Sequence, residues 1–441
     1  MEKYLRPSTN RLIERLKEPV RKIIVVAGPR QIGKTTAVHQ ALRGRPEESY
    51  AFYGVDVPDT GAGDTPADWS VATASIPSPG ALVAHDASWL VEKWQQARRA
   101  ALTWSLQKTE TRNQPEPKPP YVLVFDEIQD IPNWSGIVKG LRDQDRAQDF
   151  PMHVVVLGSA PLLMQRDLSE SLMGRFELLE MTHWSYSEMH DCFGFTLDQF
   201  IYFGGYPGPA HWVLEGREDR WRDEVLHSLI EPNLVKDILA LARIEKPAVL
   251  RQLFQLGCTY SGQIVALTKL LTQLSDAGNT TTLTHYLQLL RAAGLLAGLE
   301  KYAAQAIRQR AAPPKLNVLN TAFLSVYSGK NFAQARADSR FWGHLVESSV
   351  GAHLLATATG GLQVAYWRES PYEVDFIVHQ GARIAALEVK STVPDLSAKK
   401  GLRQFAEKHS KLSVRTQVLG GDDFALADAL TQPASHWLPE S

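Results

Sequence analysis

A glycine-rich stretch directly after a short apolar run is the feature that most constrains how this chain folds. Residues 28–35, GPRQIGKT, fit the pattern G-x-x-x-x-G-K-[ST] and follow the β-branched run Ile23–Ala27. A helical stretch from Lys34 to Leu42 comes next. The backbone N–H groups of such a loop surround a phosphate closely, and the positive end of the following helix adds to the attraction. The order of strand, loop and helix predicts a phosphate-binding loop in a parallel α/β sheet.

This loop is expected to hold ATP. Lys34 is expected to reach the β- and γ-phosphates, and the Thr35 hydroxyl is expected to ligate Mg²⁺. The predicted nucleotide-binding residues are Gly28, Pro29, Arg30, Gln31, Ile32, Gly33, Lys34, Thr35 and Thr36.

An acidic pair closes a second buried-strand signal, Tyr121–Phe125. Ligands of parallel sheets bind at the carboxyl ends of the strands, where this pair would lie. Asp126 is expected to hold Mg²⁺ through its water shell, and Glu127 to polarise the attacking water as general base. The alternative is an Asp-Glu pair that only begins a helix, where it complements the helix dipole.

Two further polar residues belong to the same predicted site. Ser159 follows the third apolar run, His153–Leu157, and is either a sensor of the γ-phosphate or a helix N-cap. Arg175 precedes a further apolar segment. It is either an arginine finger acting in trans, which requires a homo-oligomer, or a surface arginine.

Composition limits the remaining possibilities. A length of 441 residues predicts about three domains. The 47 Lys and Arg against 48 Asp and Glu give a net charge of −1, which excludes a polybasic nucleic-acid condenser but allows a local basic groove. Two cysteines are too few for a disulfide framework. With neither a signal-peptide pattern nor a membrane-spanning stretch, the sequence predicts a cytoplasmic protein without membrane contact.

The middle of the chain is expected to form a winged helix. Apolar spacing predicts one helix over Gln263–Leu274 and, after a break, a second one capped by Thr280–Thr282 and ended by Gly294, before an apolar strand. DNA engagement and purely structural packing between domains remain alternatives, with the wing cations favouring DNA. The polar residues expected to face solvent or lie in the wing are Thr281, Thr284, His285, Gln288, Arg291, Lys301, Arg308 and Arg310.

The motifs together resemble a known family. GPRQIGKTT, VLVFDEIQDIPNW, VVLGSA and SLMGRFELLEMTHWSYSEM are similar to segments of bacterial and archaeal AAA+-type ATPases whose Walker B strand ends in D-E-I/V-Q. The C-terminal domain of those proteins, of unknown function, resembles restriction endonucleases. The chain departs from the family in its long insertions before Walker B and in Ala160-Pro161, where similar proteins show serines. The resemblance extends from Gly28 to Lys390 and assigns family positions to Lys34, Asp126, Glu127, Ser159 and Arg175.

A C-terminal constellation follows the D…E-x-K arrangement of the restriction-endonuclease-like fold. Asp375 lies near the start of one predicted strand, and Glu388 and Lys390 share a face of the next. Glu347, on the preceding predicted helix His344–Leu354, resembles the extra acidic ligand of that fold. Asp375 and Glu388 are the expected Mg²⁺ ligands, and Lys390 would position or activate the water that attacks a phosphodiester. The alternative is that these carboxylates pair with Lys390 and Arg383 on a solvated sheet face.

The predicted fold class is α/β: a P-loop (AAA+-like) parallel sheet with helices, then a winged-helix region and a restriction-endonuclease-like α/β domain. The predicted function is hydrolysis of Mg-ATP coupled to DNA engagement, with DNA cleavage left open. The alternative is a non-hydrolysing ATP-dependent switch with an inactive docking domain. The predicted domains are 1–190 (ATPase, insertion at about 58–120), 191–245 (helical lid or linker), 246–310 (winged helix) and 311–441 (nuclease-like).

Overall fold

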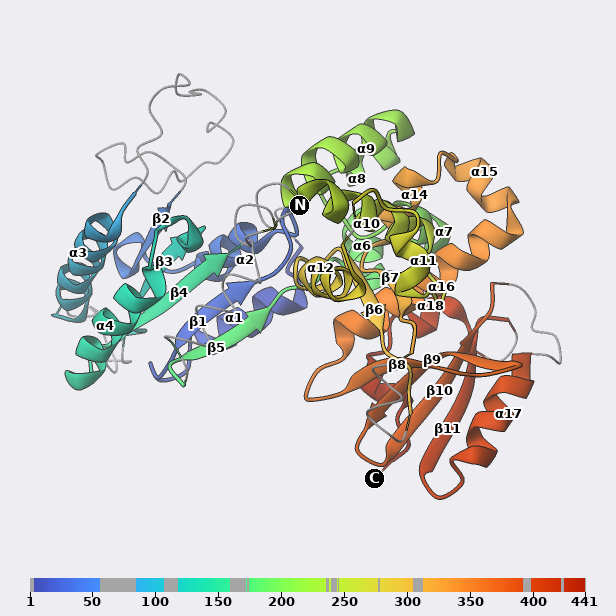
Figure 1. Cartoon of the computed structure of the whole chain (residues 1–441). Helices are drawn as coiled ribbons and strands as arrows, with labels where there is room; N and C mark the ends of the chain where they lie inside the picture. The colour runs from blue at the N-terminus through green and yellow to red at the C-terminus, as the bar shows by residue number, and fades with distance from the viewer. Residues whose placement is uncertain are drawn as a thin grey trace. The chain divides into compact units, whose positions relative to one another are not determined.

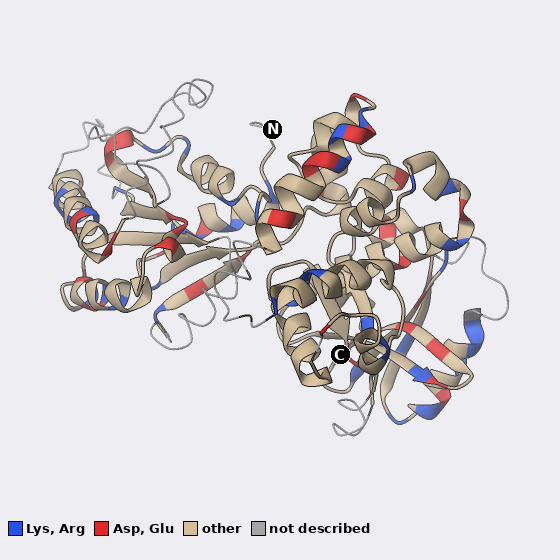
Figure 2. Cartoon of the chain, turned by 45° about the horizontal axis from the view of Figure 1, so that its top comes forward, with Lys and Arg blue, Asp and Glu red and all other residues tan. Residues whose placement is uncertain are grey.

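The chain forms two compact units, Met1–Met181 and Thr182–Ser441, which are described separately (Figure 1). The structure is a computed structural model. It describes residues 4–55, 85–106, 118–158, 172, 174–234, 238, 244, 246–276, 278–303, 312–391, 398–421 and 424–440. Lys and Arg are interspersed with Asp and Glu along the described helices of both units, as a net charge near zero suggests (Figure 2).

The N-terminal unit contains a five-stranded parallel sheet in the order β2-β3-β4-β1-β5. Every residue of β1, β3 and β4 is buried, which explains why these strands appear in the sequence as continuous apolar runs. Because all strands run the same way, their carboxyl ends share one edge of the sheet. The strands are β1 Ile23–Ala27, β2 Tyr50–Gly54, β3 Tyr121–Asp126, β4 Met152–Gly158 and β5 Phe176–Glu180.

Helices cover both faces of this sheet. Figure 1 shows α3 and α4 together on one side and α1 and α2 on the other. Buried side chains of α3 and α4, among them Trp94 and Val138, pack with Val25 and Phe125 of the strands. The helices are α1 Pro7–Arg15, α2 Lys34–Leu42, α3 Ala87–Leu106 and α4 Trp134–Ala147, with short 3-10 helices at Glu47–Ser49 and Ile128–Asp130.

Helix α3 lies inside the stretch expected to be an insertion, yet it is part of the core. Asp145 of α4 is 1 % exposed and accepts hydrogen bonds from Trp94 Nε1 (2.9 Å) and Arg98 Nε (2.6 Å) of α3. The predicted insertion contains two stretches rich in turn-forming residues, 58–80 and 109–120, which lie almost entirely outside the described residues. Helix α3 is therefore an integral element of the packed core and not surface material.

The first part of the C-terminal unit is helical. It continues into a second group of helices followed by an antiparallel hairpin of β6 and β7. The helices are α6 Tyr186–Phe193, α7 Leu197–Phe203, α8 Ala210–Leu214, α9 Glu218–Glu224, a π-helical turn Val225–Ile230, α10 Pro247–Thr259, α11 Leu267–Leu271 and α12 Thr280–Ala292; the strands are β6 Leu296–Leu299 and β7 Lys315–Val318.

Helix α11 is much shorter than the predicted helix 263–274. The backbone before it is extended alongside β7: Gly262 N–H donates to Leu316 O (2.8 Å), Leu316 N–H to Gln263 O (3.0 Å) and Val265 N–H to Pro314 O (3.0 Å). These tertiary bonds replace the first helical turn. The N-terminal cap of α12 also differs from the predicted Thr280–Thr282. Asn279 is the capping residue, because its side-chain Oδ1 accepts a hydrogen bond from the Thr282 N–H at 2.9 Å.

The rest of the C-terminal unit surrounds a four-stranded sheet in the order β11-β10-β9-β8. β9 is antiparallel to both β8 and β10, whereas β10 and β11 are parallel. The predicted boundary at 310/311 separates β6 from β7, although the two strands form one hairpin. The elements are α14 Thr321–Tyr327, α15 Phe332–Ala337, α16 Ser339–Thr357, β8 Gln363–Glu369, β9 Tyr372–Gln380, β10 Arg383–Val389, α17 Ala398–Lys408, β11 Ser413–Leu419, α18 Leu426–Ala429 and a 3-10 helix Ala434–Trp437.

None of the helices in the described parts of the chain is both long enough and apolar enough to span a bilayer.

Candidate functional site

The glycine-rich loop leads from β1 to the first turn of α2. Gly33 has a φ of 89°, a left-handed conformation that favours glycine. Gly28 has a different requirement: a Cβ atom there would lie 2.1 Å from the carbonyl oxygen of Met181. The first glycine of the motif is therefore needed for packing within the unit as well as for close approach of a ligand.

Lys34 is nearly buried, with 6 % of its surface exposed. Its ammonium donates hydrogen bonds to the carbonyl oxygens of Gly28 (3.1 Å) and Pro29 (2.8 Å). These two carbonyl acceptors hold the lysine within the loop, and its positive charge also acts on the nearby carboxylate of Asp126. The arrangement suits attraction of an anion such as a phosphate.

Thr35 and Asp126 are brought together from positions 91 residues apart. The Thr35 hydroxyl donates to Asp126 Oδ2 at 2.6 Å. The pKa of Asp126 is raised to about 6, because burial and the negative charge of Glu127 raise it more than the hydrogen bond from Thr35 lowers it. A hydroxyl and a carboxylate are oxygen ligands of the kind Mg²⁺ takes beside a nucleotide, so these residues fit that ion.

Glu127 follows Asp126 at the carboxyl end of β3. Its backbone is left-handed, with a φ of 53°, and its N–H donates to Asp126 Oδ1 at 3.0 Å. The Gln129 side-chain amide donates to Glu127 Oε2. This bond orients the glutamate, a contribution of Gln129 that sequence reasoning missed although the glutamine stands two residues after Glu127.

The two other predicted residues of this site are Ser159 and Arg175. Ser159 lies outside the described residues. Arg175 pairs with Asp143 (Nε to Oδ1, 2.7 Å; Nη2 to Oδ2, 3.2 Å). It directly precedes β5 and thus lies at the amino edge of the sheet, opposite the loop of its own chain. The pair raises the pKa of Arg175 and lowers that of Asp143.

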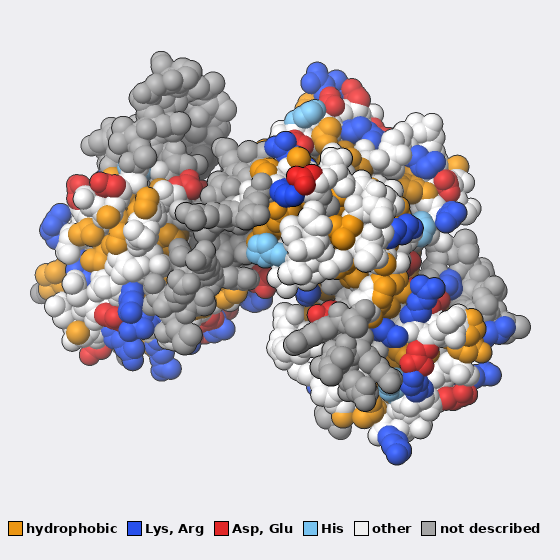
Figure 3. Space-filling model, viewed as in Figure 1, with side chains coloured by type: hydrophobic (Ala, Val, Ile, Leu, Met, Phe, Trp, Pro, Cys, Tyr) orange, Lys and Arg blue, Asp and Glu red, His pale blue; other side chains and the backbone are white. Residues whose placement is uncertain are grey.

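The second predicted surface is the polar face of α12. Thr281, Thr284, His285, Gln288 and Arg291 are all exposed, as expected. The surface over α11 and α12 carries few charged side chains in the view of Figure 3.

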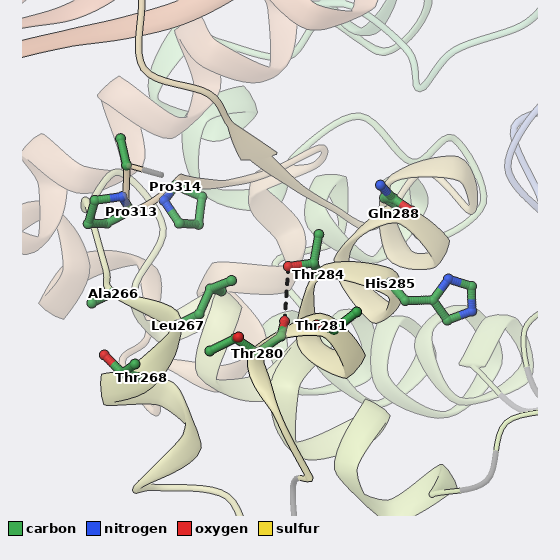
Figure 4. Close-up of a pocket in the computed structure, with 11 residues that line it drawn as sticks. Ala266, Leu267, Thr268, Thr280, Thr281, Thr284, His285, Gln288, Pro313 and Pro314 are labelled. Atoms are coloured by element: carbon green, nitrogen blue, oxygen red, sulfur yellow. Dashed lines mark hydrogen bonds between the residues drawn. The ribbon is translucent and has the colours of Figure 1, made fainter. Parts of the chain in front are cut away.

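A groove of about 590 Å³ runs beside this face of α12. In Figure 4 the threonines of α12 face Leu267 and Thr268 across the groove, with two prolines at one end. Thr284 Oγ1 donates to Thr280 O at 2.9 Å, so its methyl group and oxygen have a defined orientation. Pro313, in the groove wall, accepts a hydrogen bond from the buried Tyr366 hydroxyl of β8, which fixes the wall to the sheet. Of the wing cations, Arg308 and Arg310 lie outside the described residues.

Three carboxylates converge in the C-terminal unit: Glu347 of α16, Asp375 of β9 and Glu388 of β10, here called the carboxylate cluster. Lys390 Nζ lies 2.8 Å from Glu388 Oε1, and the Val389 N–H donates to Asp375 Oδ2 at 2.9 Å. Burial and the charge of Asp375 raise the pKa of Glu388, although Lys390 donates a hydrogen bond to it.

A lysine that the sequence analysis did not identify completes this cluster. Lys315 of β7 is fully buried, and its ammonium lies 2.5 Å from Glu347 Oε1 and 3.2 Å from Asp375 Oδ1. The only feature of the sequence that could have indicated Lys315 is its position at the start of an apolar strand. The predicted pairing of Glu388 with Lys390 is present. The cluster is largely covered rather than on a solvated face, because the side chains of Glu347 and Asp375 are 18% and 14% exposed, and Arg383 donates to Gln380 instead.

Comparisons with known proteins agree with part of this description. Residues 85–190 match an AAA domain family, and residues 194–334 and 342–432 match two domains of unknown function (DUF8612 and DUF4143). The AAA match includes the acidic end of β3, while the glycine-rich loop precedes the matched range on the same sheet. The N-terminal unit therefore combines a segment similar to an AAA domain with a glycine-rich loop on the same parallel sheet.

Curated relatives are distant. The uncharacterized proteins Rv2008c of Mycobacterium tuberculosis and Mb2031c of Mycobacterium bovis are each 26% identical over 280 residues, which is 63% of this chain and 60% of theirs. The chain thus spans less than two thirds of the length of these relatives. The uncharacterized protein MJ1544 of Methanocaldococcus jannaschii is 21% identical over 277 residues, 58% of each chain.

Two solved structures align with much of the chain at low similarity. The Walker-type ATPase PABY2304 of Pyrococcus abyssi is 13% identical, with a TM-score of 0.44, covering 74% of this chain and 99% of its own. The ORC1 protein of Aeropyrum pernix in complex with DNA is 12% identical, with a TM-score of 0.26. The alignment covers 75% of this chain and 93% of the ORC1 chain.

Proposed function

We propose that the protein hydrolyses Mg-ATP at the carboxyl edge of the N-terminal sheet and couples this turnover to DNA engagement by the C-terminal unit. The observation that carries the ATPase proposal is the 2.6 Å hydrogen bond between Thr35 and Asp126. It joins the end of the glycine-rich loop to the end of β3, so the two expected metal-holding oxygens are adjacent. The match of residues 85–190 to an AAA domain supports the same proposal.

The chain's own groups have distinct roles in this proposal. The loop amides and Lys34 bind the phosphates, with the lysine exchanging carbonyl oxygens of the loop for phosphate oxygens. Thr35 and Asp126 would hold Mg²⁺, which when bound neutralises charge on the β- and γ-phosphates. Glu127, oriented by Gln129, positions the attacking water and takes its proton. Ser159 stays proposed as the sensor of the γ-phosphate.

Phosphate release from ATP tests the enzyme proposal. Glu127→Gln should abolish turnover while Mg-ATP still binds, and Lys34→Ala should weaken nucleotide binding. Glu92→Gln, an exposed glutamate of α3 in the same unit, is the matched control and should behave as wild type. If wild type binds Mg-ATP but releases no more phosphate than Glu127→Gln, the alternative function, a non-hydrolysing switch, replaces the enzyme.

Arg175 enters this proposal only in a homo-oligomer. As an arginine finger it would leave Asp143 and act on the nucleotide of a neighbouring copy. Arg175→Ala should then lower turnover per chain only at protein concentrations where sedimentation shows an oligomer. Equal turnover of Arg175→Ala and wild type in the assembled state would leave Arg175 a surface residue paired with Asp143.

The DNA half of the proposal rests on α12. In this proposal helices α10–α12 with the hairpin β6–β7 serve as a winged helix, and α16, β8–β11 and α17 serve as a restriction-endonuclease-like domain. The exposed α12 side chains include amide, hydroxyl and imidazole groups and the cation Arg291, which can contact base edges and phosphates. DNA cleavage is not part of the proposal, because Lys315 is paired inside the carboxylate cluster.

Fluorescence anisotropy with a labelled duplex at several salt concentrations tests this half. Arg291→Ala should weaken binding and reduce the slope of log K against log salt by about 1, whereas Gln288→Ala should leave the slope unchanged. Lys330→Ala, in a surface pair with Asp338, is the control cation. Binding that is insensitive to both α12 variants would leave α12 as a packing element.

A further inference from the structure

The carboxylate cluster contains a built-in cation. Lys315 Nζ lies 2.5 Å from Glu347 Oε1 and 3.2 Å from Asp375 Oδ1, and it also donates to the Asp375 carbonyl oxygen at 3.2 Å. Its side chain is fully buried, with the ammonium 4.9 Å from the centre of the Phe376 ring. The ammonium therefore contacts two of the three carboxylates from inside the fold.

Lys315 is held on both sides through its backbone. It pairs with Leu299 of β6 on one edge and forms a β-bridge with Ile264 on the other. The neighbouring residue Leu316 makes two backbone hydrogen bonds to the segment before α11, with Gly262 and Gln263. Because β7 lies between these two backbones, the lysine cannot leave the carboxylate cluster by a local rearrangement of an exposed loop.

The electrostatics agree with a permanently charged lysine. Burial alone would lower the pKa of Lys315, but the negative charges of Glu347 and Asp375 outweigh burial and raise it. A buried ammonium with two carboxylate partners is stable only as an ion pair network, since removing one partner leaves an uncompensated charge.

These residues do not fit a divalent metal. Mg²⁺ and Ca²⁺ need carboxylate oxygens at about 2.0–2.6 Å, and an ion between Glu347 and Asp375 would compete with the ammonium for the same oxygens. Glu388 is already paired with Lys390 at 2.8 Å. Across the part of the chain that the structure describes, no group of three or more His, Cys, Asp or Glu side chains is arranged to hold a metal ion.

We infer that the ammonium of Lys315 is the resident cation of the carboxylate cluster, filling the position that a divalent ion would need. Two consequences follow. The wild-type cluster takes no divalent metal, and removal of the amine opens a site for one divalent cation between Glu347 and Asp375. This inference is independent of ATP turnover and of DNA binding.

Binding of Mn²⁺ alone to the full chain tests the inference. All proteins carry Asp126→Asn, which removes the N-terminal carboxylate expected to hold Mg²⁺, and no nucleotide is added. Free Mn²⁺ is followed by its electron paramagnetic resonance signal, and thermal unfolding is recorded with and without Mn²⁺. The variants are Lys315→Met, Lys315→Arg, which keeps the charge, and the double variant Lys315→Met/Glu347→Gln, which also removes a ligand.

We expect no saturable Mn²⁺ binding to the parent protein, which carries Asp126→Asn alone, or to Lys315→Arg in the same background. Lys315→Met should bind one Mn²⁺ per chain with a Kd on the order of 0.1–1 mM and unfold at a higher temperature in Mn²⁺. The double variant should lose this binding. If Lys315→Met is unfolded without metal, Mn²⁺ should restore its fold.

Three results would overturn the inference. The first is a saturable Mn²⁺ site in the parent that Asp375→Asn abolishes, because the cluster would then hold metal beside the lysine. The second is a folded Lys315→Met chain that binds no Mn²⁺. The third is a Lys315→Met chain that stays unfolded in Mn²⁺, since a divalent cation would then be unable to take the place of the ammonium.

Discussion

Two buried lysines beside carboxylates, Lys34 and Lys315, show how differently the two units use the same side chain. Lys34 donates to carbonyl oxygens of its own loop, which are neutral and easily exchanged for those of an anion. Lys315 contacts two carboxylates contributed by different elements of the fold. The comparison teaches that the hydrogen-bond acceptors shape the role: carbonyl oxygens of a loop can be exchanged for oxygens of a ligand, whereas two carboxylates in contact with a buried lysine make it part of the structure.

Removing the amine of Lys315 should produce the largest change. Lys315→Met leaves the largely covered carboxylates of Glu347 and Asp375 without their buried cation, which we expect to lower the free energy of unfolding of the C-terminal unit by about 3–5 kcal/mol. Amide hydrogen exchange of β7 and β9, followed by mass spectrometry in the absence of divalent metal, measures this loss. Lys330→Met is the matched control, because its surface pair with Asp338 contributes at most about 1 kcal/mol. Equal acceleration of exchange in both variants would contradict a special role for Lys315.

The same change at Lys34 should affect turnover instead of stability. Lys34→Ala removes a cation directed at the transferred phosphate, and we expect ATP turnover to fall about 100- to 1000-fold. Hydrogen exchange of β1 and β3 should stay close to that of wild type, because the two hydrogen bonds that Lys34 donates to Gly28 O and Pro29 O lie in the loop, outside both strands. Lys22→Ala, an exposed lysine before β1, serves as control. A Lys34→Ala protein with normal turnover, or one that loses the structure of its sheet, would remove the contrast between the two lysines.

Acidification should destabilise the N-terminal unit through His153. Burial lowers the pKa of His153 to about 4 from its usual 6.5, while Nε2 contacts Glu18 O at 3.1 Å. Between these two values the unfolded chain binds a proton that the folded chain does not. The contribution of His153 to the free energy of unfolding is therefore largest above pH 6.5 and falls as the pH decreases toward 4, by up to about 3 kcal/mol, while the raised pKa of Asp126 acts in the opposite direction below about pH 6.

Hydrogen exchange of β4, corrected for the intrinsic exchange rate at each pH, measures this dependence. His153→Gln keeps a donor for Glu18 O and cannot titrate, so its stability should change less between pH 7 and 4. A variant that keeps the full pH dependence of wild type would assign the effect to other groups.

Lys390 should have the smallest effect of the residues compared. Its side chain is 33% exposed in the pair with Glu388, so solvent replaces much of what the pair contributes. We expect Lys390→Met to cost about 1 kcal/mol or less. Exchange of the β10 amides reports the change, and a loss as large as that of Lys315→Met would mean that both lysines are structural.

Much of the N-terminal site is predictable because its signals are local. The loop 28–36 is one continuous stretch, and Asp126 and Glu127 follow directly from a run of apolar residues. Parallel strands then bring their carboxyl ends to one edge without further information. The edge strand β2 is only half-buried, and its residues do not form the continuous β-branched run that predicts a buried strand. Helix α3 was not predicted, because it lies between two stretches rich in turn-forming residues.

The C-terminal site is only partly predictable. Asp375, Glu388 and Lys390 follow a short spacing pattern, and α16 was expected from its apolar residues. Lys315 has no pattern of its own, since nothing local distinguishes a structural lysine from any other lysine at the start of a strand. The shortening of α11 is equally nonlocal, because its first turn is replaced by hydrogen bonds to β7.

The sequence by itself determined the P-loop, the acidic end of β3 and the succession of strands and helices, because each depends on neighbouring residues and on the period of apolar positions. Only the tertiary structure decided which charges meet. Glu347, Asp375 and Lys315 lie on three separate elements, and the energy of a buried ion pair depends on distance and burial, which the linear spacing of residues does not specify.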